Sequence, residues 1–311
     1  MVAKCPLCKS NCKHELSSND IMFRGDCLYD YAVCSSCSIS FIYPMPSINK
    51  IKKFYPDSYL IFTPAKIKKF SFFEKLRLHY KHGYDFLLEP NFLFKCFFKF
   101  IPKLPEGINF KKNGRFLDVG CGNGSRMLKM RALGWNVTGV ELNNIAVAEC
   151  EKNSLKVYNS TLEKVDFKNN LYDVIYLSHL IEHVNNPEEI LFLIHKILAN
   201  NGHLYIKTPN RNSLGRKIFK RFWYANDIPR HLILYSKNSF KLLSKKLGFE
   251  IIGYKEFTTP KIFLNSLDYS LNRKNTSKRN KFARFFARFY IFFATILKQG
   301  DESYYILKKK A

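Results

Sequence analysis

The apolar positions of this chain form short runs that alternate with segments of helical periodicity. The runs at 116–119, 136–140 and 172–177 are rich in β-branched and aromatic side chains, as buried parallel strands are. Amphipathic segments separate them, and this alternation predicts an α/β fold with a mostly parallel sheet. The pattern predicts further strands at 157–158, 203–206, 249–254 and 300–309, and helices at 125–133, 145–153, 187–198 and 237–247. Asn201 and Gly202 are expected to end the third of these helices, a long loop is expected between Asn210 and Asp227, and Ser236 is expected to cap the last helix.

A glycine-rich turn follows the run at 116–119. Gly120, Gly122 and Gly124 allow the backbone to approach a ligand without a Cβ clash, Asp118 precedes them, and Glu141 ends the next strand. A strand, glycine turn, helix, strand and terminal acid indicate a nucleotide-type cofactor pocket in which the acid binds ribose hydroxyls. The spacing differs from the G-x-G-x-x-G that a dinucleotide site requires.

The acid-x-Gly-x-Gly-x-Gly pattern resembles the signature of class I S-adenosylmethionine-dependent methyltransferases, with Glu141 as their ribose-binding acid. The resemblance implies a Rossmann-like, seven-stranded, mostly parallel sheet with helices on both faces. It implies S-adenosyl-L-methionine as the cofactor. Cys121, inside the glycine turn, is expected to face this cofactor and not to act as a nucleophile. The cofactor-binding residues that it implies are Asp118, Gly120, Cys121, Gly122, Gly124, Glu141, Leu142, Thr161, Leu162 and Ser178. For Thr161 and Leu162, an ordinary loop that does not contact the cofactor is an equally good interpretation.

Histidines are the candidates for the catalytic chemistry. His179, Glu182 and His183 lie in a segment that resembles the family's Glu-His-x-x-x-Pro motif, and His231 lies in a Pro-x-His-Leu segment that resembles its acceptor-side loop. A hydroxyl acceptor needs a general base, for which histidine suits neutral pH. We expect His231 or His183 in this role, with His179 behind them; the alternative is neutral histidines that shape the pocket. No Asn-Pro-Pro-Tyr tetrad follows the fourth strand, so hydroxyl or carbon methylation is favoured over amide or base-nitrogen methylation.

Cysteines concentrate at the N-terminus, where six of the nine lie in the first 37 residues. Two C-x-x-C pairs separated by 25 residues can supply four thiolates to a closed, structural zinc ion, and this reading outweighs disulfides in a reducing cytoplasm. The predicted ligands are Cys5, Cys8, Cys34 and Cys37, with Cys12, His14 and Cys27 as possible substitutes.

The segment after the second cysteine pair leads through a Pro-x-Pro turn, Pro44 to Pro46, to aromatic residues at 54–59. It resembles the N-terminal module of bacterial methyltransferases that act on sugars and other small metabolites. The resemblance covers residues 5–60 and 113–257. It implies a small-molecule acceptor, such as a sugar nucleotide or a lipid-linked glycan precursor. We expect a zinc ribbon at 1–48, a helical connector at 49–112 and a methyltransferase domain at 113–311.

The charge and aromatic content leave other partners open. Lys and Arg number 51 against 25 Asp and Glu, a net charge of +26 that favours an anionic partner, although an AT-rich genome would give a similar bias. An RNA methyltransferase is one alternative, disfavoured because no KH, RRM or OB pattern is readable. A non-catalytic zinc-ribbon binding protein is another, disfavoured by the intact glycines and Glu141.

Two segments combine basic residues with many phenylalanines. The first, 92–100, predicts a helix that packs on a neighbour or contacts a membrane surface. The second lies in a helical insertion at 258–299, which contacts anionic lipid, covers the active site or meets a dimer partner. The N-terminus has no secretory pattern and no apolar run reaches membrane-spanning length, so the chain is expected to be cytoplasmic, with peripheral attachment to the inner membrane face as a further hypothesis. The oligomeric state stays open.

Overall fold

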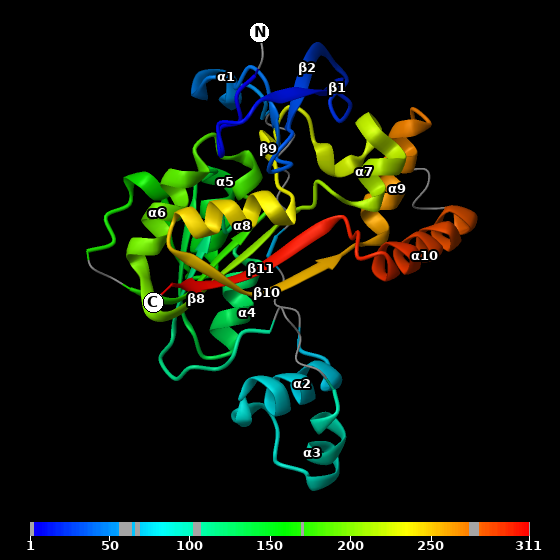
Figure 1. Ribbon diagram of the computed structural model, residues 1–311. Helices are drawn as coiled ribbons and strands as arrows, with labels where there is room; N and C mark the ends of the chain where they lie inside the picture. The colour runs from blue at the N-terminus through cyan, green and yellow to red at the C-terminus, as the bar shows by residue number, and fades with distance from the viewer. Residues whose placement is uncertain are drawn as a thin grey trace. The chain divides into compact units, whose positions relative to one another are not determined.

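The computed structural model describes residues 3–55, 64–65, 69–101, 107–168, 171–273 and 280–310 (Figure 1). Tyr59 of the predicted aromatic cluster lies outside these ranges. The strands are β1 Cys12–Asp20, β2 Gly25–Cys34, β3 Ser40–Ile42, β4 Arg115–Val119, β5 Asn136–Glu141, β6 Lys156–Asn159, β7 Tyr172–Ser178, β8 Leu198–Pro209, β9 Ile233–Leu234, β10 Phe249–Phe257 and β11 Glu302–Lys309. The α-helices are α1 Ile48–Lys52, α2 Phe72–His82, α3 Phe92–Lys99, α4 Ser125–Ala132, α5 Asn144–Lys152, α6 Pro187–Ile197, α7 Leu214–Phe219, α8 Lys237–Lys246, α9 Pro260–Ser270 and α10 Lys281–Ile296.

Seven strands form the main sheet, in the order β10-β11-β8-β7-β4-β5-β6. β4 pairs in parallel with both β5 and β7, and β5 pairs in parallel with β6. β11 pairs with β10 in the antiparallel sense. The predicted Rossmann-like, mostly parallel sheet with a closing antiparallel strand is confirmed.

A second, four-stranded sheet has the order β1-β2-β3-β9. Its first three strands come from the N-terminal module, and its last strand comes from the acceptor-side loop, with Phe41 of β3 paired to Ile233 of β9. The sheet therefore joins two segments that lie far apart in the sequence.

The chain divides into two compact units. One contains residues 1–61, 178–192 and 206–311, and the other contains residues 62–177 and 193–205. The glycine turn lies in the second unit, whereas the four predicted metal ligands and the candidate catalytic histidines lie in the first. The predicted boundaries at 48 and 112 stay predictions.

Several helices begin where the sequence predicts. The Ser236 hydroxyl accepts a hydrogen bond from the Ser239 backbone at the start of α8, and Ser239 returns one to form a capping box. Asn186 accepts from the Glu189 N–H, one residue before α6 begins at Pro187. The predicted helix over 92–100 is observed as α3.

Two predictions for the chain between β7 and β9 are wrong. The helix expected to reach Leu198 ends at Ile197, and β8 begins at once, so Asn201 and Gly202 lie within a strand rather than at a helix end. At Gly202 a Cβ would meet the Ala199 and Tyr172 carbonyl oxygens at 2.9 Å, and this close backbone approach explains the glycine. The stretch expected as a loop before Asp227 contains α7 and two 3₁₀ turns.

The predicted helical insertion is observed as α9 and α10. Ala283 and Ala287 of α10 pack with Leu264 of α9. The Tyr290 hydroxyl donates to Asp301 at 2.7 Å, which ties α10 to the start of the last strand. Within the described ranges, none of the helices combines the length and the apolarity that a bilayer crossing requires.

Candidate functional site

The glycine turn after β4 has the backbone that its sequence predicts. Gly120, Gly122 and Gly124 have φ values of 72°, 54° and 76°, a region that side chains with a Cβ rarely adopt. The Gly120 and Cys121 N–H groups donate to the Val140 carbonyl of β5 at 2.8 and 3.2 Å. Gly124 leads directly into α4, so the turn presents a helix N-terminus and backbone N–H groups, as a nucleoside site requires.

Glu141 joins this turn to the end of β5. One carboxylate oxygen accepts the Gly122 N–H at 2.9 Å, and the other accepts the Leu142 and Asn143 N–H groups at 2.8 and 2.9 Å. The oxygen that accepts the Gly122 N–H has a second lone pair free for a ribose hydroxyl, whereas the other oxygen is filled by its two N–H donors. The residues therefore fit the predicted cofactor, with Glu141 also fixing the turn.

Asp118 is buried beneath the turn. Burial, opposed by the Arg126 guanidinium and reinforced by the charge of Glu141, raises the pKa of the Asp118 carboxyl to about 7. Arg126 lies in the first turn of α4, with its guanidinium 3.7 Å from the centre of the Tyr176 ring. No motif in the sequence indicates a role for Arg126, which is distinguished only by its position shortly after the glycine turn.

The other predicted cofactor residues have different surroundings. Leu142 is 63% exposed at the end of β5, where an apolar side chain can cover a base, while Leu162 is buried. Thr161 and Ser178 are half-buried. Cys121 does not face a ligand as predicted, because its side chain packs in a core cluster with Met127, Leu128, Cys150 and Leu155. Only its backbone belongs to the turn.

The structure brings the four predicted metal ligands together. Cys5, Cys8, Cys34 and Cys37 are free thiols whose sulfur atoms all lie within 4.8 Å of one another. The Cys5–Cys37 and Cys8–Cys34 sulfur pairs are 3.6 and 3.4 Å apart. A tetrahedral zinc ion with Zn–S bonds of about 2.3 Å needs sulfur atoms roughly 3.8 Å apart, so the donor set fits this metal. The Cys8 and Cys37 N–H groups point at sulfur atoms of their own pairs at 3.4 Å, as they would to stabilise thiolates.

His183 and His231 form a pair in the first unit. Their rings meet edge to face with centroids 4.6 Å apart. The His231 Nδ1 lies 2.8 Å from the Ala225 carbonyl, which can only accept, so Nδ1 carries the proton and Nε2 holds the lone pair. That Nε2 is 3.9 Å from carboxylate oxygens of both Glu182 and Asp227.

The charge states of this cluster follow from burial and from these neighbours. Burial and the neighbouring His231 imidazole lower the pKa of His183 to about 4, so the His183 imidazole is neutral at pH 7. Burial opposes ionisation of Glu182, but the hydrogen bond and charge of His179, with the nearby His231 and His183, lower the pKa of its carboxyl to about 2.

His179 is held between two carboxylates. Its Nδ1 is 3.2 Å from Glu182 and its Nε2 is 2.7 Å from Glu302, which also binds Lys207 at 3.0 Å. Burial opposes the charged form, but both carboxylates outweigh it and raise the pKa of His179 to about 9. A protonated imidazole donates from both nitrogens and accepts no proton.

The N-terminal module contacts both histidines of the pair. The Tyr31 hydroxyl donates to the His231 carbonyl, and the Tyr55 hydroxyl lies 2.9 Å from His183 Nδ1. The sequence pattern indicates Tyr55 only as part of an aromatic cluster and does not indicate Tyr31, because neither residue has a local signal of its long-range contact.

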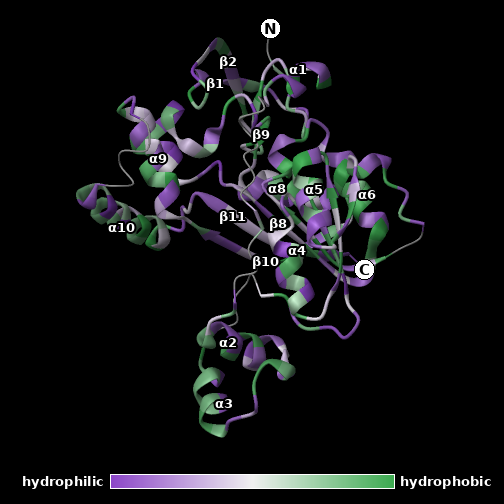
Figure 2. Cartoon of the chain, turned by 180° about the vertical axis from the view of Figure 1, so that it is seen from behind, coloured by the Kyte–Doolittle hydropathy of each residue, from purple (hydrophilic) through white to green (hydrophobic). Residues whose placement is uncertain are grey.

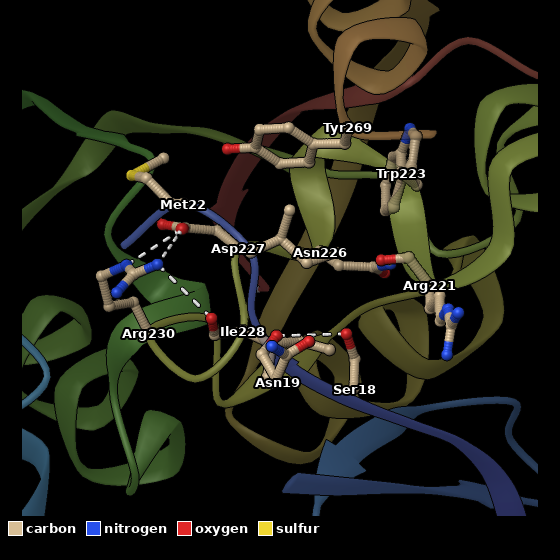
Figure 3. A pocket seen from close by; sticks show the side chains of 11 residues that line it. Ser18, Asn19, Met22, Arg221, Trp223, Asn226, Asp227, Ile228, Arg230 and Tyr269 are labelled. Atoms are coloured by element: carbon tan, nitrogen blue, oxygen red, sulfur yellow. Dashed lines mark hydrogen bonds and ion pairs between the residues drawn. The ribbon is translucent and has the colours of Figure 1, made fainter. Parts of the chain in front are cut away.

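Arg230, on the acceptor-side loop that carries His231, binds the tip of the N-terminal module. It is fully buried, binds Asp20 of β1 at 2.6 Å and binds Asp227 at 2.8 Å. Figure 3 shows Arg230 directed at Asp227 and at the Ile228 carbonyl on the wall of a cavity. This cavity has a volume of about 10 Å³, the space of roughly one water molecule. The loop is therefore packed against the module, and His231 is set rigidly.

Comparison with known proteins agrees with the geometry of the turn. Residues 91–253, somewhat more than half of the chain, match the family of methyltransferase domains. The chain belongs to this family, and its fold and glycine turn are those of a class I S-adenosylmethionine-dependent methyltransferase.

The individual relatives are more distant. A ubiquinone biosynthesis O-methyltransferase from Rickettsia conorii is 36% identical over 121 residues, which cover 35% of this chain and 42% of that protein. A protein of the same name from Photobacterium profundum is 28% identical, over 32% of this chain and 45% of its own length. The matches thus span less than half of either relative. A solved S-adenosylmethionine-dependent methyltransferase from Archaeoglobus fulgidus is 20% identical, with a TM-score of 0.46, over 77% of this chain and all of that one.

Proposed function

We propose that this enzyme transfers the methyl group of S-adenosylmethionine to a hydroxyl or carbon of a small metabolite, with His231 as the proton acceptor. The observation that carries the proposal is the His231 imidazole, whose Nε2 lone pair faces two carboxylates. The cofactor supplies an activated methyl group, so the protein has to align the acceptor and remove its proton.

The surroundings of His231 suit a base. When Nε2 accepts a proton, the imidazolium is stabilised by Glu182 and Asp227, both within 4 Å of it. His183 stays neutral, so it adds no opposing positive charge. We assign His183 to orienting the acceptor, and we leave His179 out of the catalytic pair because both of its nitrogens bind carboxylates.

Two lines of support bear on the acceptor. The N-terminal module resembles that of methyltransferases acting on sugars, which supports a sugar nucleotide or a lipid-linked glycan precursor. The relatives are named O-methyltransferases of ubiquinone biosynthesis, which supports a hydroxyl and adds phenolic acceptors to those worth testing.

We also propose that Cys5, Cys8, Cys34 and Cys37 hold a structural zinc ion. With four protein ligands the ion has no open position for a substrate. Its role is to fix the module that holds Tyr31 and Tyr55 against the histidine pair.

The test is methyl transfer from labelled S-adenosylmethionine to sugar nucleotides, phenols and RNA. We expect transfer to one small-molecule class, and His231→Gln to lower kcat by roughly 10²–10⁴-fold while cofactor affinity is unchanged. Lys237→Gln, an exposed change at the start of α8, serves as control. Undiminished kcat in His231→Gln would reject the assigned base, and transfer to RNA alone would reject the acceptor class.

A further inference from the structure

Helix α10 has an unusual distribution of side chains. Its buried positions are Ala283, Ala287, Tyr290 and Ala294, a stripe with helical spacing. Its phenylalanines lie elsewhere on its surface. The usual arrangement, in which large apolar side chains face the protein and small or polar ones face water, is therefore reversed.

The small-residue stripe is what attaches α10 to the first unit. Ala283 and Ala287 pack with Leu264 of α9, and the Tyr290 ring lies 4.9 Å from that of Phe263. Alanine permits close approach of the two helices, and the Tyr290 hydroxyl is satisfied by Asp301. None of these contacts involves a phenylalanine of α10.

An aromatic face lies on the opposite side of α10; we define it as Phe285, Phe289, Phe292 and Ile296. Each of these residues is two positions after one of the small-residue stripe, a rotation of about 200°. Their exposed fractions run from 47% to 59%. Phe282, Phe286 and Phe293 beside them are 51% to 75% exposed. At roughly 200 Å² for each aromatic side chain, the exposed apolar area exceeds the few hundred Å² that monomers usually leave open.

A basic edge runs beside the aromatic face. Lys281, Arg284 and Arg288 are spaced i, i+3 and i+7 and are all exposed. Residues 280–298 contain no Asp or Glu. Purple and green residues alternate along α10 in Figure 2. The charge complements an anionic surface, and the exposed rings suit a boundary between polar and apolar media.

We propose that α10 docks this enzyme on an anionic lipid bilayer, with the aromatic face in the headgroup region and the basic edge on the lipid phosphates. The helix spans 16 residues, too few for a crossing, so it lies in the plane of the interface. A second copy of the chain would leave this basic edge against an equally basic partner, which argues against a symmetric dimer.

Helix α3, in the other unit, carries the same combination independently. Phe92, Leu93, Phe97 and Phe100 are 57% to 85% exposed, and Lys95 and Lys99 are exposed between them. Of the described apolar residues in this segment, Phe98 is the buried one, packed near Phe73 and Tyr80. The predicted packing of this helix on a neighbour therefore accounts for little of its apolar surface.

The experiment is vesicle co-sedimentation of the full chain. The probes are phosphatidylcholine vesicles with and without phosphatidylglycerol, at low and high salt. We expect binding to the anionic vesicles that weakens with salt, and a loss of roughly tenfold or more in Phe285→Ser/Phe289→Ser/Phe292→Ser. Arg284→Gln/Arg288→Gln should reduce binding to anionic vesicles alone.

A matched control distinguishes an effect of the aromatic face from an effect of removing any exposed apolar side chains. Leu28→Ser/Ile48→Ser/Ile252→Ser removes three exposed apolar side chains outside α10 and should bind like the parent. An unchanged circular dichroism spectrum and an unchanged midpoint of unfolding in every variant verify folding. Equal partitioning of the Phe variant and the parent overturns the proposal. So does a parent dimer in light scattering that becomes monomeric in the Phe variant without vesicle binding.

Discussion

At the scale of single residues, Glu141 supports both the backbone and the expected ligand. We predict that Glu141→Ala weakens S-adenosylmethionine binding by roughly tenfold or more, because three backbone N–H groups lose their acceptor and the ribose loses its partner. Glu141→Gln, which retains an acceptor oxygen, should be intermediate. Calorimetric titration measures the effect, and equal affinity of Glu141→Ala and the parent would contradict the assigned role.

The ion pairs of His179 with Glu182 and Glu302 lead us to predict that the folded protein loses stability at alkaline pH. Its pKa is raised from 6.5 to about 9 in the folded protein, so its contribution is fully present below pH 6.5 and is lost as pH rises through 9. Urea unfolding at a series of pH values should show a steeper fall above pH 6.5 in the parent than in His179→Gln. Parallel curves for the two proteins would show that the ion pairs do not form.

At the scale of elements, the start of α8 is coupled to the cysteine module. The Ser236 hydroxyl caps the helix through Ser239 and also donates to the Cys37 carbonyl at 3.1 Å. We predict that Ser236→Ala lowers the free energy of unfolding by about 1–2 kcal/mol. Ser71→Ala, at the exposed cap of α2, should cost less. Denaturant titration of both variants checks the order, and a larger loss in Ser71→Ala would refute it.

The sequence was most informative where local chemistry decides the structure. Glycines with positive φ, an acid at the end of β5 and a serine before α8 each act within a few residues, and their predictions agree with the structure. Asn201 and Gly202 were misread because local propensity favours a turn there, whereas the chain is drawn into β8. Arg126 and Tyr31 were missed because their roles depend on partners distant in sequence or on neighbouring strands.

The side-chain direction of Cys121 illustrates a second limit. Its place inside the glycine turn suggested a ligand contact, but the positive φ values on either side rotate its side chain into the core beside Cys150. The backbone of a motif was thus predictable from sequence, while the direction of one side chain within it was not.

At the scale of the whole molecule, the proposed metal site and the cofactor turn belong to different compact units. One unit contains the four cysteines of the metal group, Tyr31, Arg230 and the histidine pair, and the other contains the glycine turn with Glu141. Loss of the metal should free the β1–β2 hairpin, whose contacts with Arg230 and the His231 carbonyl hold the acceptor-side loop.

We therefore predict that removing zinc separates catalysis from cofactor binding. Chelation, or Cys34→Ser, should lower methyl transfer by roughly tenfold or more, since a misplaced base loses its alignment with the acceptor. Affinity for S-adenosylmethionine should stay within about twofold, because Val140, Glu141 and Cys150, which bind the turn, lie in the same unit as the turn. Cys27→Ser, at an exposed cysteine outside the metal group, is the control. Metal content by atomic emission, transfer rate and cofactor affinity are measured on the same samples. A parallel loss of binding and transfer would mean that the module supports the whole fold, and full activity without metal would mean that it does not position the histidines.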